Sequence, residues 1–146
     1  MNAQDQLKQA LREDLAPQLR ELGFRGTERK FSLPSERYFA QIGIQSSDSS
    51  TRELVKFTVN LSVIDKAAWA RARDERSYLP VKPSLNVSYL PWRDESEWHE
   101  PIGRLLDGED KWWLLDSEGA WREEVVLEVF NAIAYYGLPA MKTRME

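Results

Sequence analysis

Two adjacent tryptophans, Trp112 and Trp113, lie beside a cluster of charged side chains and give this chain its strongest candidate for binding chemistry. Successive side chains of a β-strand point to opposite faces, so the two indoles cannot both enter one core. We therefore expect one indole to be covered by a second layer or to stay exposed for a partner or ligand. The residues assigned to this candidate site are Arg104, Asp107, Glu109, Asp110, Trp112, Trp113 and Asp116.

Catalytic chemistry has few residues to draw on. His99 is the only histidine, so any histidine-containing metal site or Ser-His-Asp arrangement would depend on it. The absence of cysteine excludes disulfides, zinc-thiolate sites and thiol nucleophiles. The acids at 107–110 lack the spaced ligands and closing glutamate of a calcium loop, and no glycine-rich phosphate loop is present. We therefore assign no catalytic residue, no metal ligand and no cofactor, and the residues favour a protein that is not an enzyme while leaving the enzyme alternative open.

Negative charge is concentrated in one part of the sequence. Residues 92–124 carry eleven acidic and four basic side chains, whereas the whole chain has a net charge of −4. The same segment holds five of the six tryptophans. Acidic groups repel phosphate and attract basic protein surfaces, and desolvated aromatic side chains act as anchors at such interfaces. This pattern favours a protein partner with a basic surface, although a solvated acidic face over a tryptophan-containing core would have the same composition.

Binding to nucleic acid and to membranes is disfavoured. Arg25, Arg29, Lys30 and Arg37 surround the first predicted strand, but the sequence pI is near 5.2 and the neighbouring aromatic residues are also expected in the core. No apolar run approaches the ~18 residues that a membrane span needs. We expect a soluble, cytoplasmic protein that binds neither nucleic acid nor membranes.

The length fits a single domain that spans residues 1–146. Leucines spaced three or four residues apart predict a helix over 7–22, interrupted near Asp14 because of Pro17 and stopped by Gly23. Alternation of apolar and polar residues predicts strands over 38–45 and 55–63, and 27–33 is expected to form a shorter strand. The alanine-rich segment 65–76 favours a second helix, with Asp65 as its N-terminal cap.

The second half of the chain is broken up by prolines, and a short edge strand or an extended loop is expected over 85–89. Segments 102–106 and 111–115 are expected to pair as a hairpin around a turn that contains Asp107 and Gly108. A final helix, capped by Asp116 or Ser117, is predicted to end or kink at 137–139, before a short basic tail. Its buried stripe is expected to be Trp121, Val125, Val129, Ile133 and Tyr136. The sum is an α+β fold in which an antiparallel sheet of about 4–6 strands is packed by long N- and C-terminal helices.

These segments together resemble the bacterial DUF4304 family over nearly the whole chain. The resemblance is carried by Leu22-Gly23-Phe24, the strands at 42–45 and 57–61, Ile102-Gly103-Arg104-Leu105, Asp110-Lys111-Trp112-Trp113 and Leu138-Pro139. The tryptophan pair is the most specific of these motifs. The resemblance implies a compact α+β domain of unknown function and supplies no catalytic residues.

The favoured hypothesis is a non-catalytic binding module, inhibitor-like or immunity-like, that occupies the basic surface of a partner protein. Trp112 or Trp113 would be its apolar anchor, and the neighbouring acids would provide charge complementarity. The alternative is a small-molecule-binding protein, or an enzyme of unknown reaction, whose tryptophans line a pocket closed by Arg104 and His99. A third possibility places both indoles in the core and the function on another surface. The exposure of the two rings distinguishes these alternatives.

Overall fold

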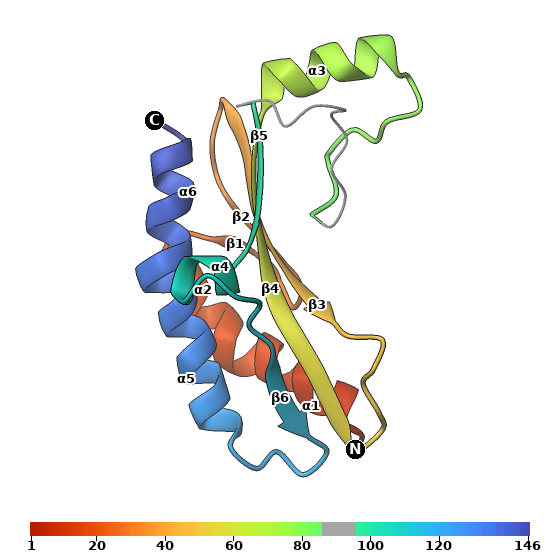
Figure 1. Cartoon of the computed structure of the whole chain (residues 1–146), viewed down its shortest axis with the longest axis vertical. Helices are drawn as coiled ribbons and strands as arrows, with labels where there is room; N and C mark the ends of the chain where they lie inside the picture. Colours follow the sequence, from red (N-terminus) through yellow and green to blue (C-terminus); the bar gives the residue numbers. More distant parts are fainter. Residues whose placement is uncertain (86–95) are drawn as a thin grey trace.

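An antiparallel sheet of six strands forms the centre of the molecule (Figure 1). The computed structural model describes residues 1–85 and 96–146. The strands are β1 (Arg25–Thr27), β2 (Lys30–Leu33), β3 (Tyr38–Ser46), β4 (Leu54–Asp65), β5 (Glu97–Pro101) and β6 (Trp113–Asp116). They run in the order β1-β2-β3-β4-β5, and β6 also pairs with β4. With helices at both ends of the chain, this architecture confirms the predicted α+β single domain.

Strand β4 organises the sheet because it is 12 residues long and pairs with three other strands. Strand β3 lies along one of its edges. On the other edge, β5 pairs with residues 60–64 and β6 pairs with residues 54–57. Alternate side chains of β4 enter the main core, and none of them is more than 3% exposed: Val55, Phe57, Val59, Leu61 and Val63. The predicted strand over 55–63 is therefore confirmed.

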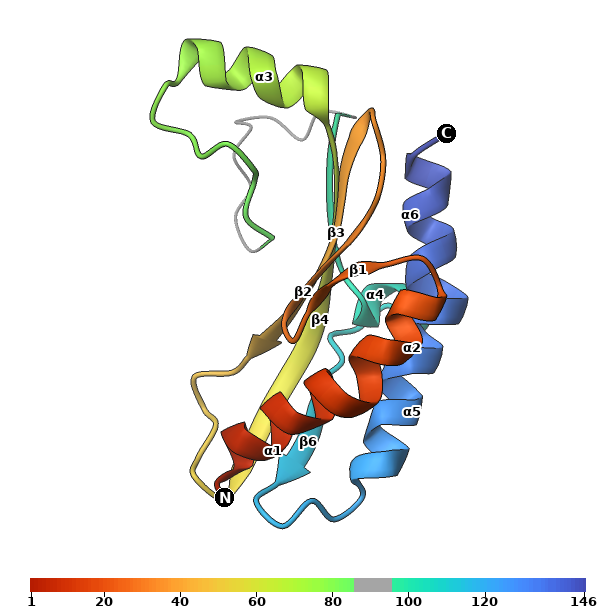
Figure 2. The ribbon, with the colours of Figure 1, turned by 180° about the vertical axis from the view of Figure 1, so that it is seen from behind.

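The N-terminal helices cover this apolar face of the sheet (Figure 2). They consist of α1 (Ala3–Gln9), the π-helical segment η1 (Ala10–Leu15) and α2 (Ala16–Glu21). The predicted interruption near Asp14 is therefore present as η1. Its position follows from Pro17, because a proline in a helix has no N–H to donate and its ring clashes with the carbonyl four residues earlier. Gly23 follows α2 with a φ of +103°, in the left-handed region that glycine adopts readily.

The C-terminal helices pack beside the N-terminal ones and likewise consist of two α-helices joined by a π-helical segment. They are α5 (Arg122–Ala132), the π-helical η2 (Ile133–Gly137) and α6 (Leu138–Arg144), with Pro139 in the first turn of α6. The predicted interruption at 137–139 coincides with the boundary between η2 and α6, but the basic segment that follows is helical to Arg144 rather than a tail. The predicted cap is also wrong: α5 starts after Trp121, and the Asp116 carboxylate instead accepts the backbone N–H groups of Glu118 and Ala120 in the preceding turn.

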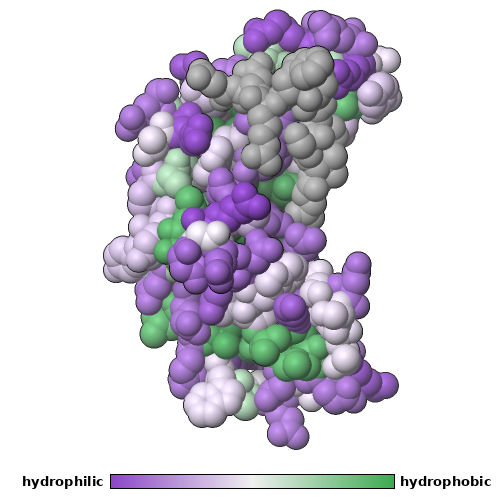
Figure 3. Space-filling view, in the orientation of Figure 1, coloured by the Kyte–Doolittle hydropathy of each residue, from purple (hydrophilic) through white to green (hydrophobic). Residues whose placement is uncertain are grey.

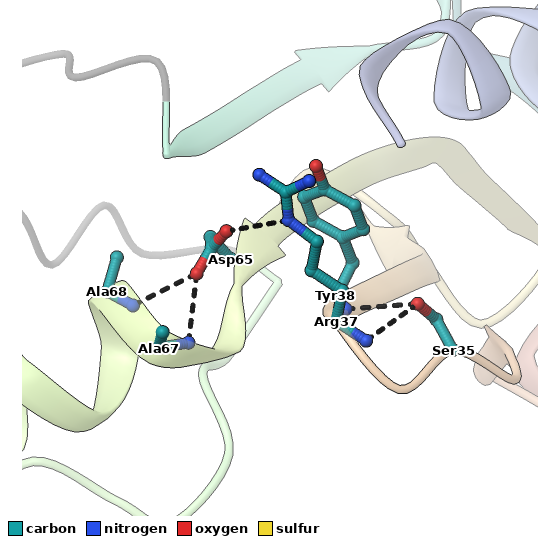
Figure 4. A network of polar contacts seen from close by, with 6 residues as sticks. All are labelled: Ser35, Arg37, Tyr38, Asp65, Ala67 and Ala68. Atoms are coloured by element: carbon teal, nitrogen blue, oxygen red, sulfur yellow. Dashed lines mark hydrogen bonds and ion pairs between the residues drawn. The ribbon is translucent and has the colours of Figure 1, made fainter. Parts of the chain in front are cut away.

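A smaller layer lies on the opposite face of the sheet, at the end where β4 meets α3 (Lys66–Glu75). Its apolar residues are Ile64, Trp69, Ala72 and Leu79, with Phe39 packed against them. As predicted, Asp65 caps α3, and its carboxylate accepts the N–H groups of Ala67 and Ala68 at 2.9 and 3.1 Å. Arg37 Nε lies 3.2 Å from the same carboxylate (Figure 4). Burial raises the pKa of Asp65, but these hydrogen bonds and the Arg37 charge outweigh it and lower the pKa below its ordinary value.

The predicted hairpin over 102–106 and 111–115 is wrong. Residues Gly103–Leu106 form a single helical turn, α4, and the strands on either side of it pair with β4 rather than with each other. Gly103 explains the tight return of the chain, because a Cβ at this position would overlap the Glu109 carbonyl oxygen and the Lys111 backbone nitrogen. Loop 107–112 therefore crosses directly over Gly103 on its way from α4 to β6.

Segment 27–33 is not one strand: β1 and β2 pair as a hairpin, with Arg25 opposite Ser32 and Thr27 opposite Lys30. Most of the expected strand at 85–89 lies outside the described residues. None of the helices that the structure describes has a stretch both long and apolar enough to cross a bilayer.

Candidate functional site

The two adjacent tryptophans have different surroundings. Trp113 begins β6, is 3% exposed and packs on Phe57, its partner on β4, with the ring centroids 6.0 Å apart. Trp112 precedes the strand and is half-buried, and Lys56 Nζ lies 5.4 Å from the centroid of its ring. As expected from strand geometry, the two indoles do not share one core. Neither of them is a fully exposed anchor.

The charged residues of the candidate site lie on three elements. Asp107, Glu109 and Asp110 are exposed on the loop after α4. Arg104 is exposed on α4, with its Nε 3.7 Å from Glu100 Oε1. Asp116 ends β6 and is half-buried, because its carboxylate binds the turn before α5. The seven predicted residues are thus close in sequence, but only some of them share a surface.

An open groove of about 440 Å³ brings Asp107 and Trp113 together with the C-terminal helices. We call it the tyrosine groove. Its lining residues are Leu106, Asp107, Lys111, Trp113, Glu128, Asn131, Ala132, Tyr135 and Tyr136. Tyr135 is 71% exposed and Tyr136 is 50% exposed, so both phenol rings are available to another molecule. The other five predicted residues lie outside this lining.

Sequence reasoning missed the two tyrosines because it placed Tyr136 on the buried stripe of the final helix. Val125, Val129 and Ile133 are buried as predicted, but Trp121 and Tyr136 are exposed, so these two assignments are wrong. A π-helical turn closes its hydrogen bonds over one more residue than an α-helical turn, so η2 rotates Tyr136 away from the 3.6-residue stripe. Pro139 could have indicated the irregular turn in the sequence, because it lies four residues after Tyr135 and disturbs the helical turn that contains both tyrosines.

The acidic side chains of segment 103–128, of which Asp107 and Glu128 line the groove, form no ion pair within the described part of the chain. Segment 103–128 holds eight acidic and three basic residues. Arg104 is paired with Glu100 and Arg122 with Asp14, whereas Lys111 Nζ lies 5.7 Å from the centroid of the Trp113 ring. Among residues 1–85 and 96–146, no Lys, Arg or His forms an ion pair with any of the eight acids: Asp107, Glu109, Asp110, Asp116, Glu118, Glu123, Glu124 and Glu128.

Figure 3 shows the hydropathy of the surface in the orientation of Figure 1. Hydrophilic residues cover much of this face, and a band of hydrophobic residues crosses its lower half. Leu114 of β6 is 50% exposed and Leu127 of α5 is 57% exposed. Segment 103–128 thus carries both accessible apolar side chains and acids that form no ion pair among the described residues, a combination typical of protein interfaces.

His99 lies on the opposite face of the sheet, in β5, and does not contribute to the groove. Its Nε2 is 2.7 Å from Glu97 Oε1, and the carboxylate is almost fully buried. Ser62 is opposite His99 in the strand register, but its buried hydroxyl has no hydrogen-bond partner within the described part of the chain. A serine nucleophile requires a base within hydrogen-bond reach, so these three residues do not form a catalytic triad. No cluster of three metal-binding side chains occurs among the described residues.

Comparison with known proteins identifies the family. The model of the DUF4304 family, a domain of unknown function, matches residues 15–143, so the chain belongs to this family. No curated protein and no solved structure gives a significant match.

Proposed function

We propose that this DUF4304 member is a non-catalytic, cytoplasmic bacterial protein that binds the basic surface of a partner protein through the tyrosine groove. In this role it would be inhibitor-like or immunity-like, occupying a surface that the partner needs for its own activity. The tyrosine groove takes the place of the Trp112–Trp113 pair as the contact surface, because the exposed aromatic rings in its lining are those of Tyr135 and Tyr136.

The observation that carries the proposal is the position of two exposed phenol rings beside carboxylates with no basic partner. Asp107 and Glu128 both line the groove, and neither forms an ion pair among the described residues. Tyrosine is enriched in interface hot spots because it buries a large, rigid area while its hydroxyl still finds a hydrogen-bond partner. The acids would increase the rate of encounter with a basic surface and would exclude acidic ones.

Small-molecule binding is a second candidate, because a volume of about 440 Å³ is within the range of ligand pockets. The geometry favours it less. The groove is open, whereas a ligand pocket usually encloses most of its ligand. Arg104 and His99, the residues expected to close such a pocket, are not part of the lining, and Trp113 is almost entirely covered by the core.

Affinity capture with matched charge reversals tests the proposal. The tagged protein would be incubated with lysate of its native organism, and retained proteins would be quantified by mass spectrometry. We expect a partner that is retained by the wild type, lost with Asp107→Lys/Glu128→Lys, and weakened by Tyr135→Ala and by added salt. The control is Glu36→Lys/Glu75→Lys, which makes the same charge change at exposed residues outside the groove. Equal retention by all four proteins would contradict the proposal.

A further inference from the structure

Trp121 is the most exposed tryptophan among the described residues and lies at the start of α5. It is 73% exposed and has a φ of +64°, so the chain holds a bulky side chain in the left-handed region and points it away from the core. The ring lines a second hollow of about 430 Å³. The other residues of this Trp121 hollow are Asp14, Gly119, Arg122, Glu123 and Glu124.

The one cation in the lining of the Trp121 hollow is already neutralised. Arg122 Nε is 2.7 Å from Asp14 Oδ2, and its side chain is only 19% exposed. Glu123 and Glu124 are exposed, and neither forms an ion pair within the described part of the chain. The hollow therefore offers an incoming group an accessible indole face with two uncompensated carboxylates beside it. An aromatic face beside carboxylates attracts a Lys or Arg side chain by cation–π and charge interactions.

The Trp121 hollow and the tyrosine groove lie along the same helix. Glu124 lines the first and Glu128 lines the second, and side chains four residues apart are neighbours on one helical face. Asn131 and Tyr135 continue the row into the tyrosine groove. At 1.5 Å per residue, the row from Glu124 to Tyr135 is about 16 Å long. An extended peptide covers this length with about five residues.

We propose that the partner presents an extended basic segment that lies along α5, with one cationic side chain on Trp121 and a second in the tyrosine groove about five residues away. This inference rests on the proposed function and adds the chemical class and the spacing of the recognised segment. The occupant is a basic segment of another protein, because positive charge complements the acids of this surface and the same surface of a second copy would repel them.

A peptide titration followed by NMR tests the spacing. The probe is an acetylated, amidated peptide with arginine at both ends of four serines, added to the 15N-labelled full chain at low salt. We expect the Trp121 indole N–H signal and the backbone signals of Glu128 and Tyr135 to shift together with one dissociation constant. A peptide with two adjacent arginines should bind about tenfold more weakly, because it reaches only one of the two sites. Replacing both arginines by citrulline should abolish the shifts.

The variant Trp121→Gly removes the ring and suits the left-handed backbone, so its unfolding midpoint should remain near that of the wild type. It should reduce affinity for the six-residue probe about tenfold to the level of the adjacent-arginine peptide. Tyr78→Ala is the matched control, because Tyr78 is 80% exposed but lies after α3. Shifts confined to the tyrosine groove, or an unchanged affinity in Trp121→Gly, would overturn this inference and leave the proposed function intact. If Asp107→Lys/Glu128→Lys no longer captures the partner but the peptide shifts the signals of neither site, the proposal of an extended basic segment is wrong and the proposed function stands.

Discussion

Arg122 Nε lies 2.7 Å from Asp14 Oδ2, and this ion pair joins the first residue of α5 to η1 across 108 positions of sequence. Gln9 Oε1 accepts a further hydrogen bond from the same guanidinium at 3.0 Å. Because no side-chain cap hydrogen bond is formed at the start of α5, these contacts position its first turn and the acidic row that follows it.

Removal of this guanidinium should weaken the junction between the two terminal helical segments. Arg122→Met leaves the Asp14 carboxylate without its partner, and we expect the free energy of unfolding to fall by about 1–2 kcal/mol in urea denaturation. Asp14→Asn should have little additional effect in the Arg122→Met background. Arg71→Met, at an exposed position of α3, provides the control. Equal stability of the Arg122 and Arg71 variants would show that the pair does not stabilise the fold.

The two adjacent tryptophans should differ in their contribution to stability. Trp113→Ala opens a cavity beside Phe57, so we expect the free energy of unfolding to fall by about 3–5 kcal/mol. Trp112→Ala removes a half-buried ring and a contact with Lys56, and the loss should be below about 1.5 kcal/mol. Urea unfolding curves of the two variants measure the difference. Similar losses would contradict the assignment of Trp113 to the core and of Trp112 to the surface.

Gly103 should not tolerate a side chain. In Gly103→Ala the new methyl group would overlap backbone atoms of Glu109 and Lys111, which cannot move without displacing the loop. We expect the free energy of unfolding to fall by about 1–3 kcal/mol and the backbone NMR signals of residues 107–111 to change. Gly108→Ala is a useful comparison, because no atom lies within 4 Å of its would-be Cβ and the cost would arise from its φ of +86° alone. Undisturbed signals in Gly103→Ala would contradict the predicted overlap.

Gly43 and Leu85 should show strong energetic coupling. A Cβ at Gly43 would lie 2.6 Å from Leu85 Cδ1, so Gly43→Ala should displace the leucine side chain and cost about 1 kcal/mol. In a Leu85→Ala background the same change should have almost no cost, because the space is already free. A double-mutant cycle measured by urea denaturation gives the coupling. Additive losses would show that Leu85 does not pack on Gly43.

Asp65 should make stability depend on pH in the acidic range. Its folded-state pKa is lower than the ordinary value of 3.8, so its contribution is complete above that value and is lost as the pH falls through the folded-state pKa. Asparagine can still cap a helix but carries no charge. Asp65→Asn should therefore be less stable than the wild type at pH 7, and the difference should shrink as the pH is lowered below 3.8. A difference that stays constant between these conditions would contradict a lowered pKa.

The sequence alone determined which segments form the central strands and the terminal helices. Alternation over 55–63 and the leucine spacing over 7–22 reflect local backbone geometry, in which side chains repeat every 2 or 3.6 residues. The acidic and tryptophan-rich character of residues 92–124 was likewise visible from composition. The Asp65 cap was predictable because an N-cap depends only on a few neighbouring residues.

The tertiary structure decided which aromatic rings are exposed. Trp113 is buried because β6 pairs with β4 beside Phe57. Trp121 is exposed because it precedes the first residue of α5, Arg122, and its backbone is left-handed. Tyr135 and Tyr136 reach the groove because a π-helical turn interrupts the helical period before Pro139. Exposure of a side chain depends on what packs against it from distant parts of the chain, and hydrophobic periodicity does not contain that information.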